Sequence, residues 1–262
     1  MKLLGIKKFL KIYYLGNKYG IEADMEYKTD FYFMLIRLIF TTLMVFGMVE
    51  LFFINTEELN GWTKQDFYLI TAVFMLTKSV FELLLIGITE IPGDIKNGYF
   101  DRSLLKPINL FSEYTSRGRS AYVLPNVFAY MCILIYALKL GGRLNIALLI
   151  YSIIITCIFY FAVLLFIISL NFFANFQANF TDLFREIMEF GRIPPSFYGK
   201  NIQIFFTFIF PVFSSAGIVF LVQKGEIPAY LLINIGIVIL AFLYFSLKFW
   251  HYSIRRYTSA SN

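Results

Sequence analysis

The sequence predicts an all-α membrane protein with six transmembrane helices. An amphipathic interfacial helix precedes them, and a short cytoplasmic helix lies between the second and third spans. Three observations support this fold class: 59% of the residues are apolar, only 15% are charged, and the apolar residues fall in long blocks. Soluble globular domains contain roughly 45–50% apolar and about 25% charged residues, so a soluble core could not bury this much apolar surface.

Residues 1–28 precede the first apolar block and interleave lysines, such as Lys7, Lys8 and Lys11, with Leu, Ile, Phe and Tyr. A signal peptide would instead place one continuous apolar run before a small-residue cleavage site. We therefore expect residues 1–28 to form an amphipathic helix that lies on the membrane surface.

Six apolar blocks follow, and each is long enough to cross a bilayer. Pro211 divides the fifth block, which predicts a kink, a break or a re-entrant segment there. No domain boundary is visible, so residues 1–262 are expected to form a single transmembrane domain. The expected spans are residues 31–54, 67–91, 121–140, 145–173, 202–222 and 228–250.

The distribution of basic residues predicts the orientation. With the N-terminus inside, seventeen Lys and Arg residues face the cytoplasm and four face the outside, if residues 174–201 form a cytoplasmic loop. Lys and Arg collect in cytoplasmic loops of membrane proteins. The count therefore predicts an even number of spans with both termini in the cytoplasm.

Arg37, Lys78 and Glu82 are ionisable residues inside expected spans, where a charge is costly unless it is paired or faces a wet cavity. Arg37 and Glu82 lie at matching depths, roughly 9–13 Å from the inner boundary. We expect them to form a buried pair between the first two spans. A local pair between Lys78 and Glu82, four residues apart, and a network of all three are alternatives.

A catalytic function has little support. The chain has one histidine, His251, at the inner end of the last span, and its two cysteines lie inside apolar blocks. No spacing of Cys, His or carboxylate residues indicates a metal site. No GxxxxGK[ST] phosphate-binding loop is present. We therefore expect that this chain is not itself an enzyme and that it binds no cofactor of its own.

The expected cytoplasmic loop after the second span contains EIPGDIKNGYFDRSLLKPIN, from Glu90 to Asn109. Asp94 could cap a short helix, Gly98 could end it, and Pro107 stops the run. We expect Asp94 to Leu105 to form a short helix parallel to the membrane. This helix would either orient the next span or dock a cytoplasmic partner.

The string IKNGYFDRSLLKPIN resembles the signature I-R-x-G-x-L-D-x-x-L-L-x-P-x-N of ABC-type exporter permeases of the type 2 class. Phe100 stands where Leu is usual, and Lys96 where Arg is usual. The ending RRYTSASN resembles the tail R-R-Y-x-S-A-G-N of one branch of that class, with Ser261 in place of the glycine. That branch has two related permease subunits beside a separate ATPase.

The resemblance implies the permease subunit of an ATP-driven ABC exporter, which forms half of the translocation pathway in the bacterial cytoplasmic membrane. Its partners would be two copies of an ATPase subunit, which bind ATP and Mg, and a second permease, with a related chain favoured over an identical one. No nucleic acid is expected. The residues that couple to the ATPase would be Asp94, Ile95, Lys96, Asn97, Gly98, Asp101, Arg102, Leu104 and Leu105.

The alternative is a self-sufficient secondary transporter or channel. Such a protein needs its own coupling or selectivity site, and Arg37, Lys78 and Glu82 are the candidates. Neither sequence motif identifies a transported compound.

Overall fold

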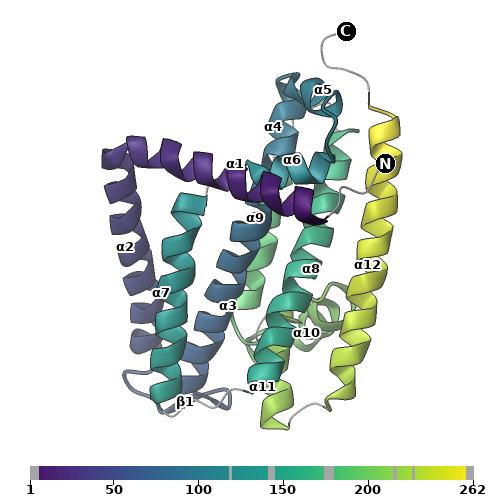
Figure 1. Cartoon of the computed structure of the whole chain (residues 1–262). Helices are drawn as coiled ribbons and strands as arrows, with labels where there is room; N and C mark the ends of the chain where they lie inside the picture. The colour runs from purple at the N-terminus through teal and green to yellow at the C-terminus, as the bar shows by residue number, and fades with distance from the viewer. Residues whose placement is uncertain are drawn as a thin grey trace.

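The computed structural model describes residues 6–117, 120–140, 145–173, 180–214, 217–225 and 228–257. Within these ranges, four helices are long and apolar enough to cross a membrane, and α7 is a shorter apolar helix beside them (Figure 1). They correspond to five of the six expected spans. Their bounds are α2 (Lys28–Phe52), α3 (Lys64–Leu85), α7 (Ser120–Lys139), α8 (Ile146–Asn171) and α12 (Tyr230–Arg255).

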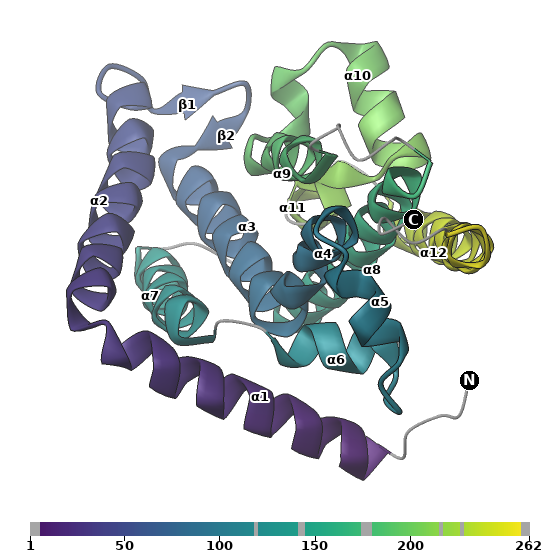
Figure 2. The same ribbon diagram turned by 90° about the horizontal axis from the view of Figure 1, so that it is seen from above.

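The two ends of the helical bundle differ. Helix α1 (Ile6–Glu26) crosses one end at a steep angle to the long helices, and a hairpin of β1 (Glu58–Leu59) and β2 (Trp62–Thr63) lies at the other, beside α2 and α3 (Figures 1 and 2). We call these the α1 end and the hairpin end. The hairpin turn has positive φ at Asn60 (49°) and Gly61 (78°), as a two-residue turn of type I′ requires.

Hydrogen bonds fix the start of α3 at the hairpin. The Thr63 hydroxyl accepts from the Asp66 backbone N–H, and the Asp66 carboxylate accepts from the Thr63 N–H, which forms a capping box. Lys224, the last residue of α11 (Gly217–Lys224), pairs with Asp66 at 2.8 Å. Both α3 and α11 therefore reach the hairpin end.

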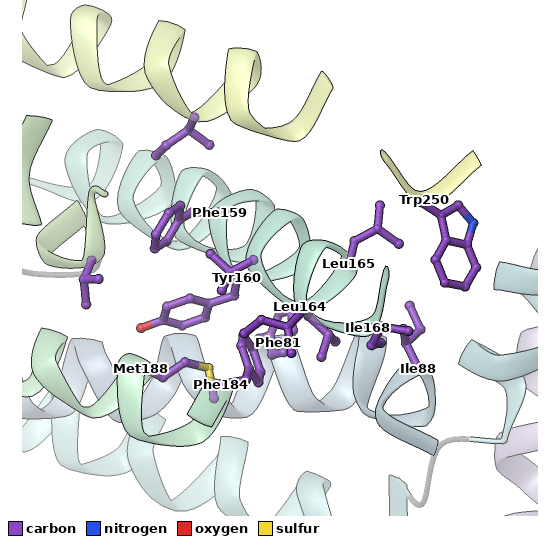
Figure 3. Close-up of a cluster of buried hydrophobic side chains, with 14 of the residues drawn as sticks. Phe81, Ile88, Phe159, Tyr160, Leu164, Leu165, Ile168, Phe184, Met188 and Trp250 are labelled. Carbon is purple, nitrogen blue, oxygen red and sulfur yellow. The ribbon is translucent and has the colours of Figure 1, made fainter. Parts of the chain in front are cut away.

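The largest apolar cluster surrounds α8 (Figure 3). Phe81 of α3 meets Tyr160 of α8 edge to face, with ring centroids 5.6 Å apart. Phe184 of α9 (Phe180–Glu189) packs against both rings, at 5.8 and 6.3 Å. Trp250 of α12 closes the cluster toward the α1 end and is 2% exposed. Burial of these aromatic side chains draws α9 into the bundle.

The segment from α9 to Ser196 differs from the predicted cytoplasmic loop. After α9, η2 (Phe190–Arg192) and η3 (Pro195–Phe197) lead to the hairpin end. There the Ser196 hydroxyl accepts a hydrogen bond of 2.7 Å from the Trp62 indole. This part of the expected loop therefore runs inside the bundle. The prediction was wrong here because the charged residues of α9 lower its hydropathy.

The expected span 202–222 is not one helix. It contains α10 (Lys200–Ile204), a π-helical turn η4 (Phe205–Ile209), a 3₁₀ turn η5 (Val212–Ser214) and α11. Pro211 lacks a backbone N–H, and Phe210 before it has left the helical region, with φ −133° and ψ 78°. Pro211 to Ser214 are buried, as irregular backbone at membrane depth requires.

Candidate functional site

Three short helices stand at the α1 end, between α3 and α7: α4 (Ile91–Lys96), α5 (Tyr99–Leu104) and α6 (Leu110–Ser116) (Figures 1 and 2). Helix α4 continues α3 through the 3₁₀ turn η1 (Ile86–Glu90), so that Lys64–Lys96 forms one column. Ile91 and Ile95, one helical turn apart, are fully buried against the core and hold α4 in this direction.

The expected single helix from Asp94 to Leu105, parallel to the membrane, was therefore wrong. Gly98 separates α4 from α5 with φ +73°, a left-handed conformation that glycine adopts without strain. The chain turns there, and α5 does not continue the direction of α4 (Figure 2). Asp94 lies in the first turn of α4 and caps no helix; its carboxylate points toward α6.

Asp94 belongs to a polar network that ties the three short helices together. The Arg117 guanidinium, directly after α6, donates to Asp94 at 2.5 Å and to Glu113 at 2.5 Å. The same Glu113 oxygen accepts from Lys106 at 2.6 Å and from Ser103 at 3.1 Å. We call the following set the α4–α6 network: Asp94, Ser103, Lys106, Glu113, Tyr114 and Arg117.

Burial and charge make this network strong. The Glu113 side chain is only 4% exposed. Burial alone would raise its pKa, but the hydrogen bonds and charges of Lys106 and Arg117 outweigh this effect and hold the pKa of Glu113 below its usual value. The Arg117 guanidinium also lies over the Tyr114 ring, 4.2 Å from its centroid. The three helices therefore form a rigid element.

The expected coupling residues divide into an interior and a surface group. Ile95 is buried, Asp94 lies in the network, Gly98 forms the turn, and Asp101 is half-buried. The remaining residues are exposed, and the exposed fraction of Leu105 is 86%. We call this surface group the tip, and it consists of Lys96, Asn97, Arg102, Leu104 and Leu105.

Sequence reasoning missed Glu113 and Arg117. Their spacing of four residues on one helix, with the acid first, favours an ion pair and could have identified them. Ser103 gave no such signal, because its part in the network depends on how α5 folds back against α6.

The charges inside the bundle pair differently from the prediction. Lys78 of α3 binds Glu189 of α9 at 2.5 Å. Sequence reasoning did not consider Glu189, because it placed α9 in a cytoplasmic loop. Among the described residues, no ion pair joins Arg37 to Glu82 or Lys78 to Glu82, although all three side chains line one cavity.

This cavity lies between α2, α3 and α7 and has a volume of about 360 Å³. Besides the three charged residues, its polar lining consists of Thr41, Ser79, Asn126 and Tyr130. Its apolar lining consists of Met34, Leu38, Val45, Met75, Ile86 and Val123.

Long apolar helices, arranged side by side and joined at one end by a rigid element, define a multi-pass membrane protein. The family model described as ABC-2 family transporter protein matches residues 35–261, so the chain belongs to this family and is an ABC-2 type permease. This confirms the class indicated by the loop and tail motifs. No curated protein and no solved structure matches the chain.

Proposed function

We propose that the chain is the permease subunit of an ATP-driven exporter, that it forms half of the translocation pathway, and that its α4–α6 element docks a separate ATPase. The observation that carries this proposal is the rigid element itself, which presents a partly apolar tip beyond the long helices. The ion pairs of Arg117 with Asp94 and Glu113 tie the three short helices together and would hold this surface in one shape, as a docking site requires. ATP and Mg would be bound by the ATPase.

The element is connected to transmembrane helices on both sides. Helix α4 continues α3, and α6 leads through Arg117 toward α7. Because the network joins α4, α5 and α6, a displacement of the tip would move α3, which α4 continues. This rigid-body coupling is how closure of the ATPase subunits would rock the spans between inward- and outward-open states.

The distribution of basic residues supports a cytoplasmic α1 end. Moving Arg185 and Arg192 into the bundle and Lys200 to the hairpin side leaves fourteen basic residues on the cytoplasmic side and five on the other. This difference still satisfies the positive-inside rule. The tip and both ends of the described chain would then face the cytoplasm, where an ATPase could bind.

Substitution of Leu105 by Asp tests the docking surface. Leu105 is 86% exposed and lies outside the network, so Leu105→Asp should leave the fold intact. It should reduce both the ATPase subunit that co-purifies and the ATP hydrolysis of the complex by tenfold or more, as expected for loss of a central apolar contact of about 1.4 kcal/mol or more.

Leu140→Asp is the matched control, because Leu140 is 43% exposed and follows α7 at the hairpin end. It should leave ATPase association unchanged. If Leu105→Asp retains normal association and hydrolysis, the α4–α6 element is not the docking site.

A second permease should complete the pathway. Only 11% of the apolar window of α2 is buried within this chain, compared with 61% for α3. A partner helix could cover α2, and an alternating mechanism needs two halves. We propose two permeases, related rather than identical, and two ATPase copies. Native mass measurement of the purified complex tests this composition, and a monomeric chain that transports alone would contradict it.

A self-sufficient secondary transporter is the second candidate function, because a cavity lined by charged residues lies between α2, α3 and α7. This function predicts substrate flux without any co-purifying ATPase. ATP-dependent flux that stops when the ATPase subunit is removed would exclude it.

A further inference from the structure

The cavity between α2, α3 and α7 combines unpaired charge with an apolar wall. These helices are neighbours in the view along the bundle (Figure 2). Arg37 lies nine residues into α2, roughly 14 Å from its start, so the charged part of the cavity is in the half nearer the α1 end. Val45 and Met75 extend the apolar lining toward the hairpin end.

The charges around the cavity are only partly neutralised. Lys78, which lines the cavity, is bound to Glu189 at 2.5 Å. Arg185, outside the lining, acts on Glu82 only through its charge and is bound to Asp182 at 3.3 Å. Arg37 and Glu82 are different: in the ranges that the structure describes, neither the guanidinium of Arg37 nor the carboxylate of Glu82 has a hydrogen-bond or ion-pair partner. One cation and one carboxylate therefore face the same cavity without binding each other.

A charge within a bilayer that lacks a direct partner is costly, so both groups favour an occupant that binds them. A purely anionic headgroup would satisfy Arg37 and meet repulsion from Glu82; a purely cationic one would do the reverse. A headgroup that carries both charges satisfies both residues at once.

We propose that this cavity binds a zwitterionic amphiphile. Its anionic group binds Arg37, its ammonium group binds Glu82, and its apolar chain lies along the lining that includes Leu38, Val45 and Met75. Asn126 and Tyr130 supply further hydrogen-bonding groups at the headgroup. The occupant is either a lipid of the surrounding leaflet or a compound that the complex transports.

Binding of radiolabelled lysophosphatidylethanolamine to the protein in a nonionic detergent tests the site. This probe should bind more tightly than lysophosphatidylglycerol, which is anionic, or dodecylamine, which is cationic. Arg37→Gln and Glu82→Gln should each weaken its binding by about tenfold or more, because each removes a hydrogen bond to a charged group. Arg37→Lys, which keeps the charge, should weaken it less.

Lys248→Gln is the matched control, because Lys248 is an exposed cation on α12 outside the cavity. It should not change the affinity. Val45→Trp, which fills the apolar part without altering a charge, should exclude the probe and serves if Glu82→Gln does not fold. Equal affinity for the three probes, or unchanged binding by Arg37→Gln, would overturn the proposal and leave two hydrated charges in a wet cavity.

ATP hydrolysis by the assembled complex separates the two sources of the occupant, and only this measurement rests on the proposed function. Stimulation by lysophosphatidylethanolamine would identify a transported compound. Binding without stimulation would identify a resident lipid. Both results retain the binding site, and failure of ATPase association would contradict the proposed function without affecting the binding measurement.

Discussion

At the scale of single residues, the ion pair of Lys78 and Glu189 joins α3 to α9 within the bundle. The Lys78 Nζ and Glu189 Oε1 atoms are 2.5 Å apart. The exposed fraction is 25% for the Lys78 side chain and 41% for the Glu189 side chain. In a membrane, water would no longer solvate that exposed surface. The pair should then contribute more than a surface salt bridge does in water.

A double-mutant cycle on Lys78→Met and Glu189→Gln should show this coupling. Each single change leaves one charge unpaired, so the double variant should be more stable than the sum of the two losses predicts. We expect a coupling energy within the range of about 0.5–3 kcal/mol, measured by thermal unfolding in detergent. A cycle on Arg37→Gln and Glu82→Gln is the control and should show a smaller coupling energy, because those charges interact only at longer range and no ion pair joins them. Additivity of the first cycle would refute the Lys78–Glu189 pair.

Glu113 should make the stability of the α4–α6 element depend on pH. The pKa of Glu113 in the folded protein lies below its usual value of 4.5. A carboxylate with a lowered pKa stabilises the fold above its unfolded pKa, and this stabilisation is lost as the pH falls through the folded pKa. Wild-type thermal stability should therefore drop below pH 4.5. Glu113→Gln should lose about 1.5–3 kcal/mol at pH 7, because the Glu113 side chain, which is only 4% exposed, loses its charge-assisted hydrogen bonds from Arg117 and Lys106.

The difference in stability between wild type and Glu113→Gln should accordingly narrow in acid. Parallel pH profiles of the two proteins would show that Glu113 does not hold the network. Asp182→Asn is a suitable control, since the Asp182 side chain is 55% exposed on α9.

At the scale of elements, α1 is fixed against α6 by a close approach at Gly16. A Cβ atom at this position would lie 2.1 Å from the carbonyl oxygen of Ser116, the last residue of α6. The Tyr13 hydroxyl donates to the Leu83 carbonyl at 2.7 Å and holds the same face of α1 against α3. Helix α1 thus contacts both the α4–α6 element and a long helix.

Gly16→Ala should displace α1 from α6. Overpacking of this kind costs about 1–3 kcal/mol, and the loss should appear as a lower thermal midpoint in detergent. Gly47→Ala is the control, because a Cβ at Gly47 of α2 meets nothing within 4 Å. That change should be neutral or slightly stabilising, since alanine favours helix more than glycine does. Equal effects of the two substitutions would contradict the close approach at Gly16.

The sequence predicts the elements to the extent that hydropathy and local chemistry determine them. Five expected spans correspond to long or apolar helices, and residues 6–26 of the expected N-terminal helix form α1. Helix α9 was missed because Asp182, Arg185 and Glu189 make its average composition polar. Its apolar residues Phe184 and Met188, four apart, do follow a helical period, and this pattern could have identified a packed face.

The partners of polar groups could not be predicted in the same way. The distance between Lys78 and Glu189 depends on how α9 packs into the bundle, which no local pattern specifies. Similarly, α4 continues α3 beyond Pro92 because Ile91 and Ile95 are buried by residues distant in sequence. Pro92 lies in the first turn of α4, where its missing backbone N–H would have no partner within the helix. It therefore does not end the helix here, as a proline usually does.

At the scale of the whole molecule, the orientation of the bundle decides which surface an ATPase can reach. The described chain begins with α1 and ends after α12 at the same end of the bundle, which also carries the tip (Figure 1). Lys96 of the tip and Glu57 beside the hairpin are both exposed and lie at opposite ends. They are therefore suitable positions for labelling.

Cysteine labelling in intact cells should show the hairpin end outside and the tip inside. The background carries Cys132→Ala and Cys157→Ala, because Cys132 is itself exposed. A membrane-impermeant maleimide should label Glu57→Cys in intact cells, and Lys96→Cys only after the membrane is permeabilised. The positive-inside difference supports this result, because fourteen basic residues on one side resist translocation. Labelling of Lys96→Cys in intact cells would place the tip outside and remove the physical basis for its contact with an ATPase.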